Sequence, residues 1–411
     1  MARALYIHWP FCLSKCPYCD FNSHVREGID IARWREALLA DLRHEAEIAA
    51  GEPLDSVFFG GGTPSLMPPA LVAELLAEAE RLWGFARDVE ITLEANPSSV
   101  EAANFAALAV AGVNRVSLGL QALDDETLRF LGRLHGAAEG LAALQTAQKA
   151  FERVSFDLIY ARPGQSAERW ASELETALGF GTGHLSLYQL TIEPGTRFAT
   201  DVRQGAFAPL DDDQAADLFA LTREMTAAAG LPAYEVSNHA RSGEESRHNL
   251  AYWRYQDYAG IGPGAHGRRH GVATLRHKKP ENWLAAVAGR GNGLKEERPL
   301  GAREQASEAL LMRLPSDRAR PRLSCSASFF RSISSLAGIA KRAESAARST
   351  PSSSRSPISS ASLACSRAPS GRSSFSPLPR PATAASQFSG FLWRSVATPC
   401  RLPCAPGPIP T

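Results

Sequence analysis

The stretch Cys12-Leu13-Ser14-Lys15-Cys16-Pro17-Tyr18-Cys19 decides how the rest of this 411-residue chain is interpreted. Its three cysteines are the only ones before residue 325, and they lie within eight residues. The apolar residues 4–7 before them predict a short strand, so the cysteines fall on the loop that leaves it. Three thiolates on one loop suit a soft-ligand metal centre, one ligand short of a closed tetrahedral site. An iron–sulfur cubane held in this way keeps one iron open to a ligand that is not protein.

Two other uses of these cysteines agree less well with their spacing. A structural zinc site takes paired C-x2-C elements and a fourth Cys or His. This loop has C-x3-C-x2-C and would need His8, Asp20 or His24 to complete it. A disulfide is disfavoured because the cluster is odd in number and no signal peptide precedes it. We therefore expect a soluble, cytoplasmic protein without a transmembrane segment.

Strand-like and helix-like stretches alternate through residues 1–230, which predicts an α/β fold with a parallel sheet. Apolar residues three or four apart indicate helices, at Ile31, Trp34, Leu38 and Leu42 and again at Leu71, Leu75, Leu76 and Leu82. Six short strands, rich in Val, Leu, Ile and Phe, are predicted at residues 4–7, 56–59, 89–93, 115–118, 154–158 and 184–189. Six strand–helix units are too few to close an eight-stranded barrel.

The cysteine loop, preceded by Tyr6-Ile7-His8-Trp9-Pro10-Phe11, resembles the cluster loop of radical S-adenosylmethionine (SAM) proteins. Within that superfamily it is similar to the branch of the oxygen-independent coproporphyrinogen III oxidases, from residue 3 to about residue 313. The resemblance implies a [4Fe-4S] cluster on Cys12, Cys16 and Cys19 whose open iron binds SAM. It also implies the fold, an open partial (β/α)6 TIM-like barrel with its functional loops at the C-terminal ends of the strands.

Residues at the predicted strand ends match SAM-contacting positions of the resembling family. Gly60-Gly61-Gly62-Thr63 follows the second strand, and glycines allow a backbone to approach a ligand closely with free N–H groups. Taken singly, each residue would more often be a turn glycine or a polar residue at a barrel rim. The resemblance implies as SAM contacts Tyr6, Tyr18, Gly61, Gly62, Thr63, Glu94, Gln121, Arg133 and Asp157.

Two features favour one group within that branch. The oxidases carry a further cysteine just after the third ligand, where this chain has Asp20. The later motif H-N-x-x-Y-W, at residues 248–253, marks the HemW-type proteins, which resemble heme chaperones. A neutral imidazole beside aromatic rings suits an axial heme ligand, so we predict His248 as that ligand and His266 as the reserve. From composition alone, an aromatic patch that packs an extension onto the barrel, with His248 hydrogen-bonded in it, is equally consistent.

The chain divides into three predicted regions, a barrel at residues 1–230, a small α+β extension at 231–314 and a tail at 315–411. A helix is expected at 302–314, within the extension. The tail holds 13 Lys or Arg and 2 Asp or Glu, whereas the preceding residues hold 31 and 41. Residues 316–411 contain 24 Ser and 12 Pro, a composition that predicts disorder rather than nucleic-acid binding. A change of reading frame in a GC-rich gene would produce such a tail.

The resemblance implies a heme chaperone that binds a [4Fe-4S] cluster, SAM and heme. It would pass heme to an acceptor protein, such as a membrane-associated respiratory protein. One alternative is an oxygen-independent coproporphyrinogen III oxidase of porphyrin biosynthesis, an oxidoreductase that decarboxylates propionate side chains. Another alternative is a nonfunctional product whose C-terminal region no longer folds.

Overall fold

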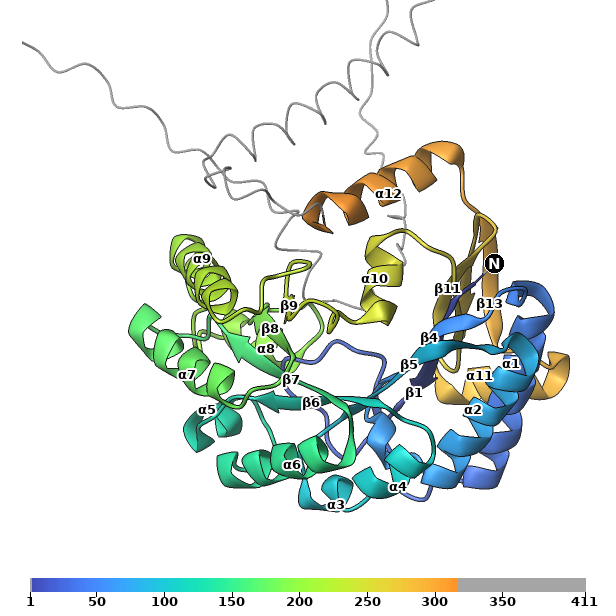
Figure 1. Ribbon diagram of the computed structural model, residues 1–411, viewed down its shortest axis with the longest axis horizontal. Coiled ribbons are helices and arrows are strands. Elements are labelled where there is room, and N and C mark those ends of the chain that lie inside the picture. Colours follow the sequence, from blue (N-terminus) through green and yellow to red (C-terminus); the bar gives the residue numbers. More distant parts are fainter. Residues whose placement is uncertain (1, 317–411) are drawn as a thin grey trace, which may run out of the picture. The chain divides into compact units, whose positions relative to one another are not determined.

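The computed structural model describes residues 2–316, and the predicted tail from residue 317 onward lies outside the described residues. Within that range one large sheet has the strand order β13-β12-β11-β10-β1-β4-β5-β6-β7-β8-β9 (Figure 1). Its strands are β1 Ala4–Trp9, β4 Leu54–Gly61, β5 Phe85–Ala95, β6 Arg115–Gln121, β7 Arg153–Tyr160, β8 His184–Gln189, β9 Asn238–Ala240, β10 Tyr258–Ile261, β11 His266–Arg269, β12 Val272–Arg276 and β13 Leu294–Pro299. A separate pair consists of β2 Phe11–Cys12 and β3 His24–Val25.

The six predicted strands are confirmed as β1, β4, β5, β6, β7 and β8, and all neighbours among them run parallel. A seventh parallel strand, β10, pairs with the other side of β1, so Leu5 lies between Val57 and Ala259. The sheet ends in β13 at one edge and β9 at the other. The fold is therefore the predicted open α/β barrel, and the carboxyl ends of its parallel strands meet at one rim.

Helices between the strands cover the outer face of the sheet (Figure 1). The helical segments are α1 Ile31–Ala49, the 3-10 turn Pro64–Leu66, α2 Pro69–Trp83, α3 Ser99–Ala102, α4 Phe105–Val110, α5 Asp125–Phe130, α6 Ala137–Ala150, α7 Ala167–Gly179, α8 Arg197–Arg203, α9 Asp212–Ala228, α10 Arg247–Trp253, α11 Pro280–Arg290 and α12 Ala302–Ser316. The predicted helix face of α1 packs inward, with Trp34, Leu38 and Leu42 all buried. The Trp34 ring stacks on Trp283 of α11, with ring centroids 5.2 Å apart.

The extension after residue 231 adds strands to both edges of the same sheet. Strand β9 pairs antiparallel with β8, and β10 to β13 continue from β1. Helix α10, which carries the H-N-x-x-Y-W motif, packs against β4. The division into domains at residue 230 stays a prediction, and strands on both sides of it share one sheet.

A buried ion network fastens this extension to α1. The Arg276 guanidinium is fully buried and lies 2.7 Å from the Asp41 carboxylate (Nε to Oδ2) and 2.9 Å from Glu45 (Nη2 to Oε2). Asp41 also accepts hydrogen bonds from Trp283 Nε1 and from the backbone N–H groups of Gly262 and Gly293. A buried charge is tolerated when its partners satisfy it in this way, so the network fixes the position of β10 to β13 beside β1.

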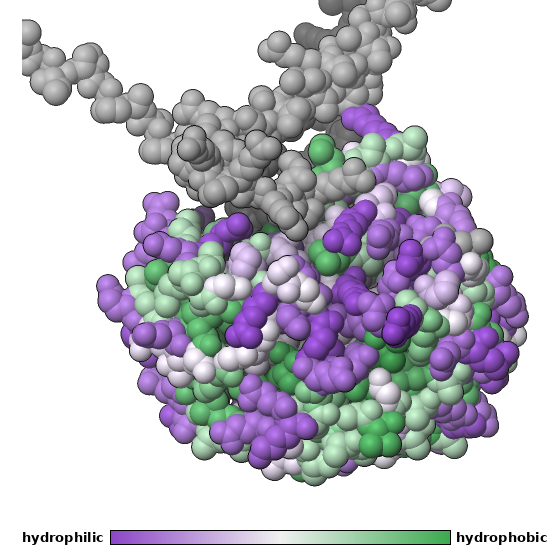
Figure 2. All heavy atoms as spheres, in the orientation of Figure 1, coloured by the Kyte–Doolittle hydropathy of each residue, from purple (hydrophilic) through white to green (hydrophobic). Residues whose placement is uncertain are grey.

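The face of the molecule in Figure 2 mixes hydrophilic and hydrophobic residues over the barrel helices. Among residues 2–316 no helix has the length and apolar character that crossing a membrane requires.

Candidate metal centre and ligand pocket

Two adjoining cavities lie within the barrel, of about 380 Å³ and about 170 Å³. The smaller one is lined by all three loop cysteines, and the larger one extends into the barrel interior. Both are bounded by residues from the carboxyl-terminal halves of β4 to β7, among them Gly61, Glu94, Gln121 and Asp157. The strand-end residues predicted from the sequence therefore gather around the cysteine loop, as the topology of a parallel sheet requires.

The cysteine loop follows β2, and its three thiols are free and partly buried. Two receive hydrogen bonds at sulfur, Cys12 from the Thr63 hydroxyl and Cys16 from Arg133 Nη1, each at 3.4 Å. Burial raises the pKa of Cys12, and raises the pKa of Cys19 to about 11, so metal ligation has to release their protons.

Within residues 2–316, no three His, Cys, Asp or Glu side chains converge closely enough to hold a single metal ion. A four-iron cluster makes a different demand, since each cysteine ligates a separate iron. Three cysteines around one cavity, with hydrogen-bond donors directed at two of the sulfurs, fit such a cluster.

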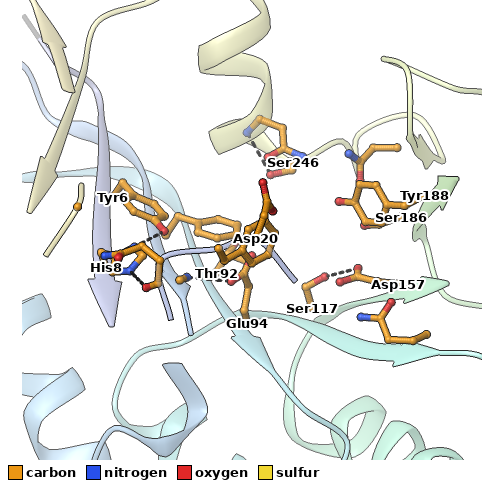
Figure 3. A pocket seen from close by; sticks show the side chains of 18 of the residues that line it. Tyr6, His8, Asp20, Thr92, Glu94, Ser117, Asp157, Ser186, Tyr188 and Ser246 are labelled. Carbon is orange, nitrogen blue, oxygen red and sulfur yellow. Dashed lines mark hydrogen bonds between the residues drawn. The ribbon is translucent and has the colours of Figure 1, made fainter. Parts of the chain in front are cut away.

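Two partly buried carboxyl groups, Glu94 of β5 and Asp157 of β7, line both cavities (Figure 3). Burial raises the pKa of Glu94 to about 8, and the charge of Asp157 adds to this effect. Burial likewise raises the pKa of Asp157 to about 6, although Ser117 donates a hydrogen bond of 3.0 Å to it. Carboxyl groups whose pKa is raised by burial in a cavity are typical of functional sites.

Gln121 at the end of β6 has two features of a ligand-binding residue. Its backbone φ is +70°, a conformation that residues other than glycine rarely adopt. Its buried Oε1 atom has no hydrogen-bond partner within the described residues. Strain and an unsatisfied polar atom are both costly, and they coincide here at the junction of the two cavities.

Arg133, also predicted as a SAM contact, lines the smaller cavity and donates to Cys16, to Asn96 Oδ1 at 2.6 Å and to the Gly119 carbonyl at 2.9 Å. Its Nε atom has no partner among residues 2–316. Together with the Gln121 amide, it offers hydrogen-bonding groups to a molecule beside the cysteine loop.

The expectation that the glycine turn leaves free N–H groups is wrong. The N–H of Gly62 donates to the Trp9 carbonyl at 2.7 Å, that of Thr63 to Phe11 at 2.8 Å, and that of Gly61 to Glu94 Oε2 at 3.2 Å. A Cβ atom added to Gly62 would lie 2.6 Å from the Phe11 carbonyl oxygen. The glycines therefore serve close packing of the turn against β1 and β2, while Gly61 still lines both cavities.

The two predicted tyrosines also lie at the cavities. Tyr6 of β1 lines the larger one, where its hydroxyl lies 3.0 Å from His8 Nδ1 (Figure 3). Tyr18 borders both cavities and receives a hydrogen bond from Arg133. Figure 3 places Tyr6 and His8 across the larger cavity from Ser186 and Tyr188.

The two histidines predicted for heme differ in their surroundings. His248 is fully buried, with Nδ1 3.1 Å from the Ser56 hydroxyl and Nε2 3.3 Å from the Tyr252 hydroxyl. Its ring stacks on Phe58, and it does not line either cavity. His266 of β11, by contrast, lines the larger cavity, where burial lowers its pKa to about 4 and keeps the imidazole neutral.

Sequence reasoning missed residues that the fold brings to the same place. Asn96 is not among the predicted site residues, yet it forms hydrogen bonds with both Thr63 and Arg133. Thr92 is buried in the cavity wall and its hydroxyl has no partner among the described residues. The available signal was position, since both residues lie within two positions of Glu94 on or just after β5.

A radical SAM superfamily model matches residues 6–177, a range that contains the cysteine loop and the residues up to Asp157. The chain is 38% identical to the heme chaperone HemW of Escherichia coli over 329 residues, which cover 78% of this chain and 84% of that protein. It is 41% identical to the bovine mitochondrial radical S-adenosyl methionine domain-containing protein 1 over 323 residues, 76% of this chain and 73% of the relative. The solved structure of E. coli coproporphyrinogen III oxidase (HemN) superimposes with a TM-score of 0.66 at 23% identity, over 76% of this chain and 75% of that one.

The radical SAM match and the relatives named as radical S-adenosyl methionine domain-containing proteins show that this open barrel with a three-cysteine loop is a radical SAM protein. Within that superfamily, identity over most of both chains shows that this chain belongs to the family of the HemW heme chaperone.

Proposed function

We propose that this protein is a heme chaperone that binds a [4Fe-4S] cluster at Cys12, Cys16 and Cys19, with SAM beside it. The observation that carries the proposal is the meeting of the three thiols with Glu94 and Gln121 around two adjoining cavities. When bound, a cluster of this kind supplies one-electron chemistry to SAM. The residues of the chain bind and orient these groups and exclude water from them.

Delivery of heme to an acceptor protein in the cytoplasm belongs to the same proposal. The proposed delivery of heme rests on relatives that are named as heme chaperones. Other relatives are named as mitochondrial proteins.

His266 is the better candidate of the two histidines for an axial heme ligand. His248 would have to exchange both ring-nitrogen hydrogen bonds for iron and leave its stack with Phe58. His266 can present a neutral imidazole to the cavity without such a rearrangement. We therefore propose a packing role for His248, which was the first choice from the sequence.

One assay tests the function against the oxidase alternative. The cluster-reconstituted protein receives heme and coproporphyrinogen III under strictly anaerobic conditions with SAM and a reductant. The expected result is heme uptake, visible as a Soret band, without decarboxylation of coproporphyrinogen III. Decarboxylation without heme uptake would overturn the proposal in favour of an oxidase.

A pair of variants tests the assignment of the heme ligand. His266→Ala should change the Soret spectrum of the heme complex, because the ligand field of the iron changes. His248→Phe keeps an aromatic ring on Phe58 and should leave the spectrum unchanged. The opposite pattern would return the ligand to His248.

A further inference from the structure

The polar residues around Cys12 and Cys16 form one connected chain of hydrogen bonds. Arg133 donates to Asn96 Oδ1 at 2.6 Å, Asn96 Nδ2 lies 3.0 Å from Thr63 Oγ1, and Thr63 Oγ1 lies 3.4 Å from Cys12 Sγ. Arg133 also donates directly to Cys16 Sγ at 3.4 Å. One guanidinium therefore reaches one cysteine directly and the other through two intermediates.

The chemistry of these groups gives the chain a direction. A guanidinium has only donors, so the amide oxygen of Asn96 must face Arg133 and the amide nitrogen must face Thr63. The amide nitrogen donates to the Thr63 hydroxyl oxygen. The hydroxyl proton is then left free to point at Cys12, the remaining neighbour in the chain.

The backbone of Asn96 is held from a third direction. Its N–H donates to Glu101 Oε2 at 2.8 Å, and the buried Glu101 carboxylate also accepts from Ser65 in the 3-10 turn that follows the glycines. The loop after β5 is thus tied to the turn after β4, which fixes the distance between Asn96 and Thr63.

We propose that Asn96 is a positioning residue that orients the Thr63 hydroxyl toward Cys12 and thereby sets the reduction potential of the bound cluster. This inference rests on the proposed function, because it requires the cluster on the three cysteines. Hydrogen bonds to ligand sulfurs tune such clusters. A donor at sulfur favours the reduced form, which carries one more negative charge.

A double-mutant cycle with Asn96→Asp and Thr63→Val tests the direction of the chain. Asp at position 96 keeps an acceptor for Arg133 but offers only an acceptor to Thr63, so the hydroxyl proton should turn from Cys12 to the carboxylate. Thr63→Val removes the hydroxyl outright. The midpoint potential, followed by the EPR signal of the reduced cluster, should fall in both single variants.

The cycle separates orientation from the added charge. In the Thr63→Val background, Asn96→Asp should lower the potential less than it does in the parent, because only its charge remains to act. Thr63→Ser retains the hydroxyl and should keep the parental potential. Equal shifts by Asn96→Asp in both backgrounds would overturn the proposal.

Two measurements keep the test decisive if a variant is impaired. If Asn96→Asp does not retain iron and sulfide, Asn96→Ala takes its place in the cycle under the same criterion. Melting temperatures of the cluster-free variants detect a purely structural role, which would lower stability without non-additive potentials. A parent protein without any cluster would contradict the proposed function instead, so the two failures are distinguishable.

Discussion

The two ends of the barrel differ in how fully the hydrogen bonds of their buried polar groups are satisfied. At the carboxyl ends of the strands, Gln121 has a positive φ and its Oε1 atom has no hydrogen-bond partner among residues 2–316, and burial raises the pKa of Glu94 to about 8. At the amino ends, the Glu90 carboxylate accepts from five donors, which are Arg115, Arg153, the Ser246 hydroxyl and the backbone N–H groups of Arg247 and His248. Unsatisfied polar groups are costly, so the contrast marks the first end as the binding end. We call the second the structural end, because its Glu90 network is satisfied, although Arg115 and Ser246 of that network also line the larger cavity.

This comparison also bears on the role of the H-N-x-x-Y-W motif in the structure. Helix α10 begins at the structural end, where Glu90 accepts from the N–H groups of its first two residues. His248 is pinned there between Ser56 and Tyr252. Within the motif, His248 packs against Ser56 and Phe58 of β4, whereas Asn249, together with Ser246 just before the motif, lines the larger cavity.

The largest effect is expected at the binding end. Cys16→Ala removes one of three ligands, so anaerobically reconstituted protein should lose the cluster, measured as iron and acid-labile sulfide. Ser14→Ala in the same loop is the matched control and should retain both. A full complement of iron and sulfide in Cys16→Ala would place the cluster elsewhere.

At the structural end, Glu90→Ala should lower the free energy of unfolding by about 3–5 kcal/mol, because it leaves the buried Arg115 without its carboxylate partner. Denaturant unfolding of the cluster-free protein measures the loss. Asp88, two residues before Glu90, has an exposed carboxylate that pairs with Arg247. Asp88→Ala should therefore change the free energy of unfolding little. Equal effects of the two substitutions would remove the basis for calling this end structural.

Glu94 should make the cluster-free protein less stable as pH rises. The folded state holds this proton more tightly than the unfolded chain, with a pKa of about 8 against about 4.3. The folded state therefore binds more protons between these values, and the free energy of unfolding falls as pH increases through that window. Each pKa unit corresponds to about 1.4 kcal/mol.

Melting temperatures measured from about pH 5 to about pH 9 report this dependence, because that range covers most of the interval between the unfolded and folded pKa values of Glu94. Glu94→Gln should flatten the profile, leaving the smaller contribution of Asp157, whose pKa rises to about 6. Glu152→Gln, at an exposed glutamate, should reproduce the parental profile. An unchanged slope in Glu94→Gln would mean that Glu94 is already ionised in the apo protein.

The sequence predicted the parts of this molecule that local patterns encode. Short runs rich in Val, Leu, Ile and Phe located β1 and β4 to β8, and parallel topology then required Glu94 and Asp157 to meet at one rim. The sequence could not predict hydrogen bonds between residues that only the folded chain brings together. Examples are the bond between Asn96 and Arg133 and the five donors to Glu90. His248 shows the same limit. The sequence pattern of a histidine among aromatic residues is the same whether its ring nitrogens face a cavity or bond to Ser56 and Tyr252.

The most direct test of the central claim is the EPR spectrum of the reduced cluster, recorded with and without SAM. If the cysteine loop and the residues around Glu94 form one site, SAM should shift the spectrum of the parent protein, because it binds at the open iron. The shift should weaken in Gln121→Ala at the binding end and persist in Asp88→Ala. A reduced cluster whose spectrum is indifferent to SAM would contradict the account.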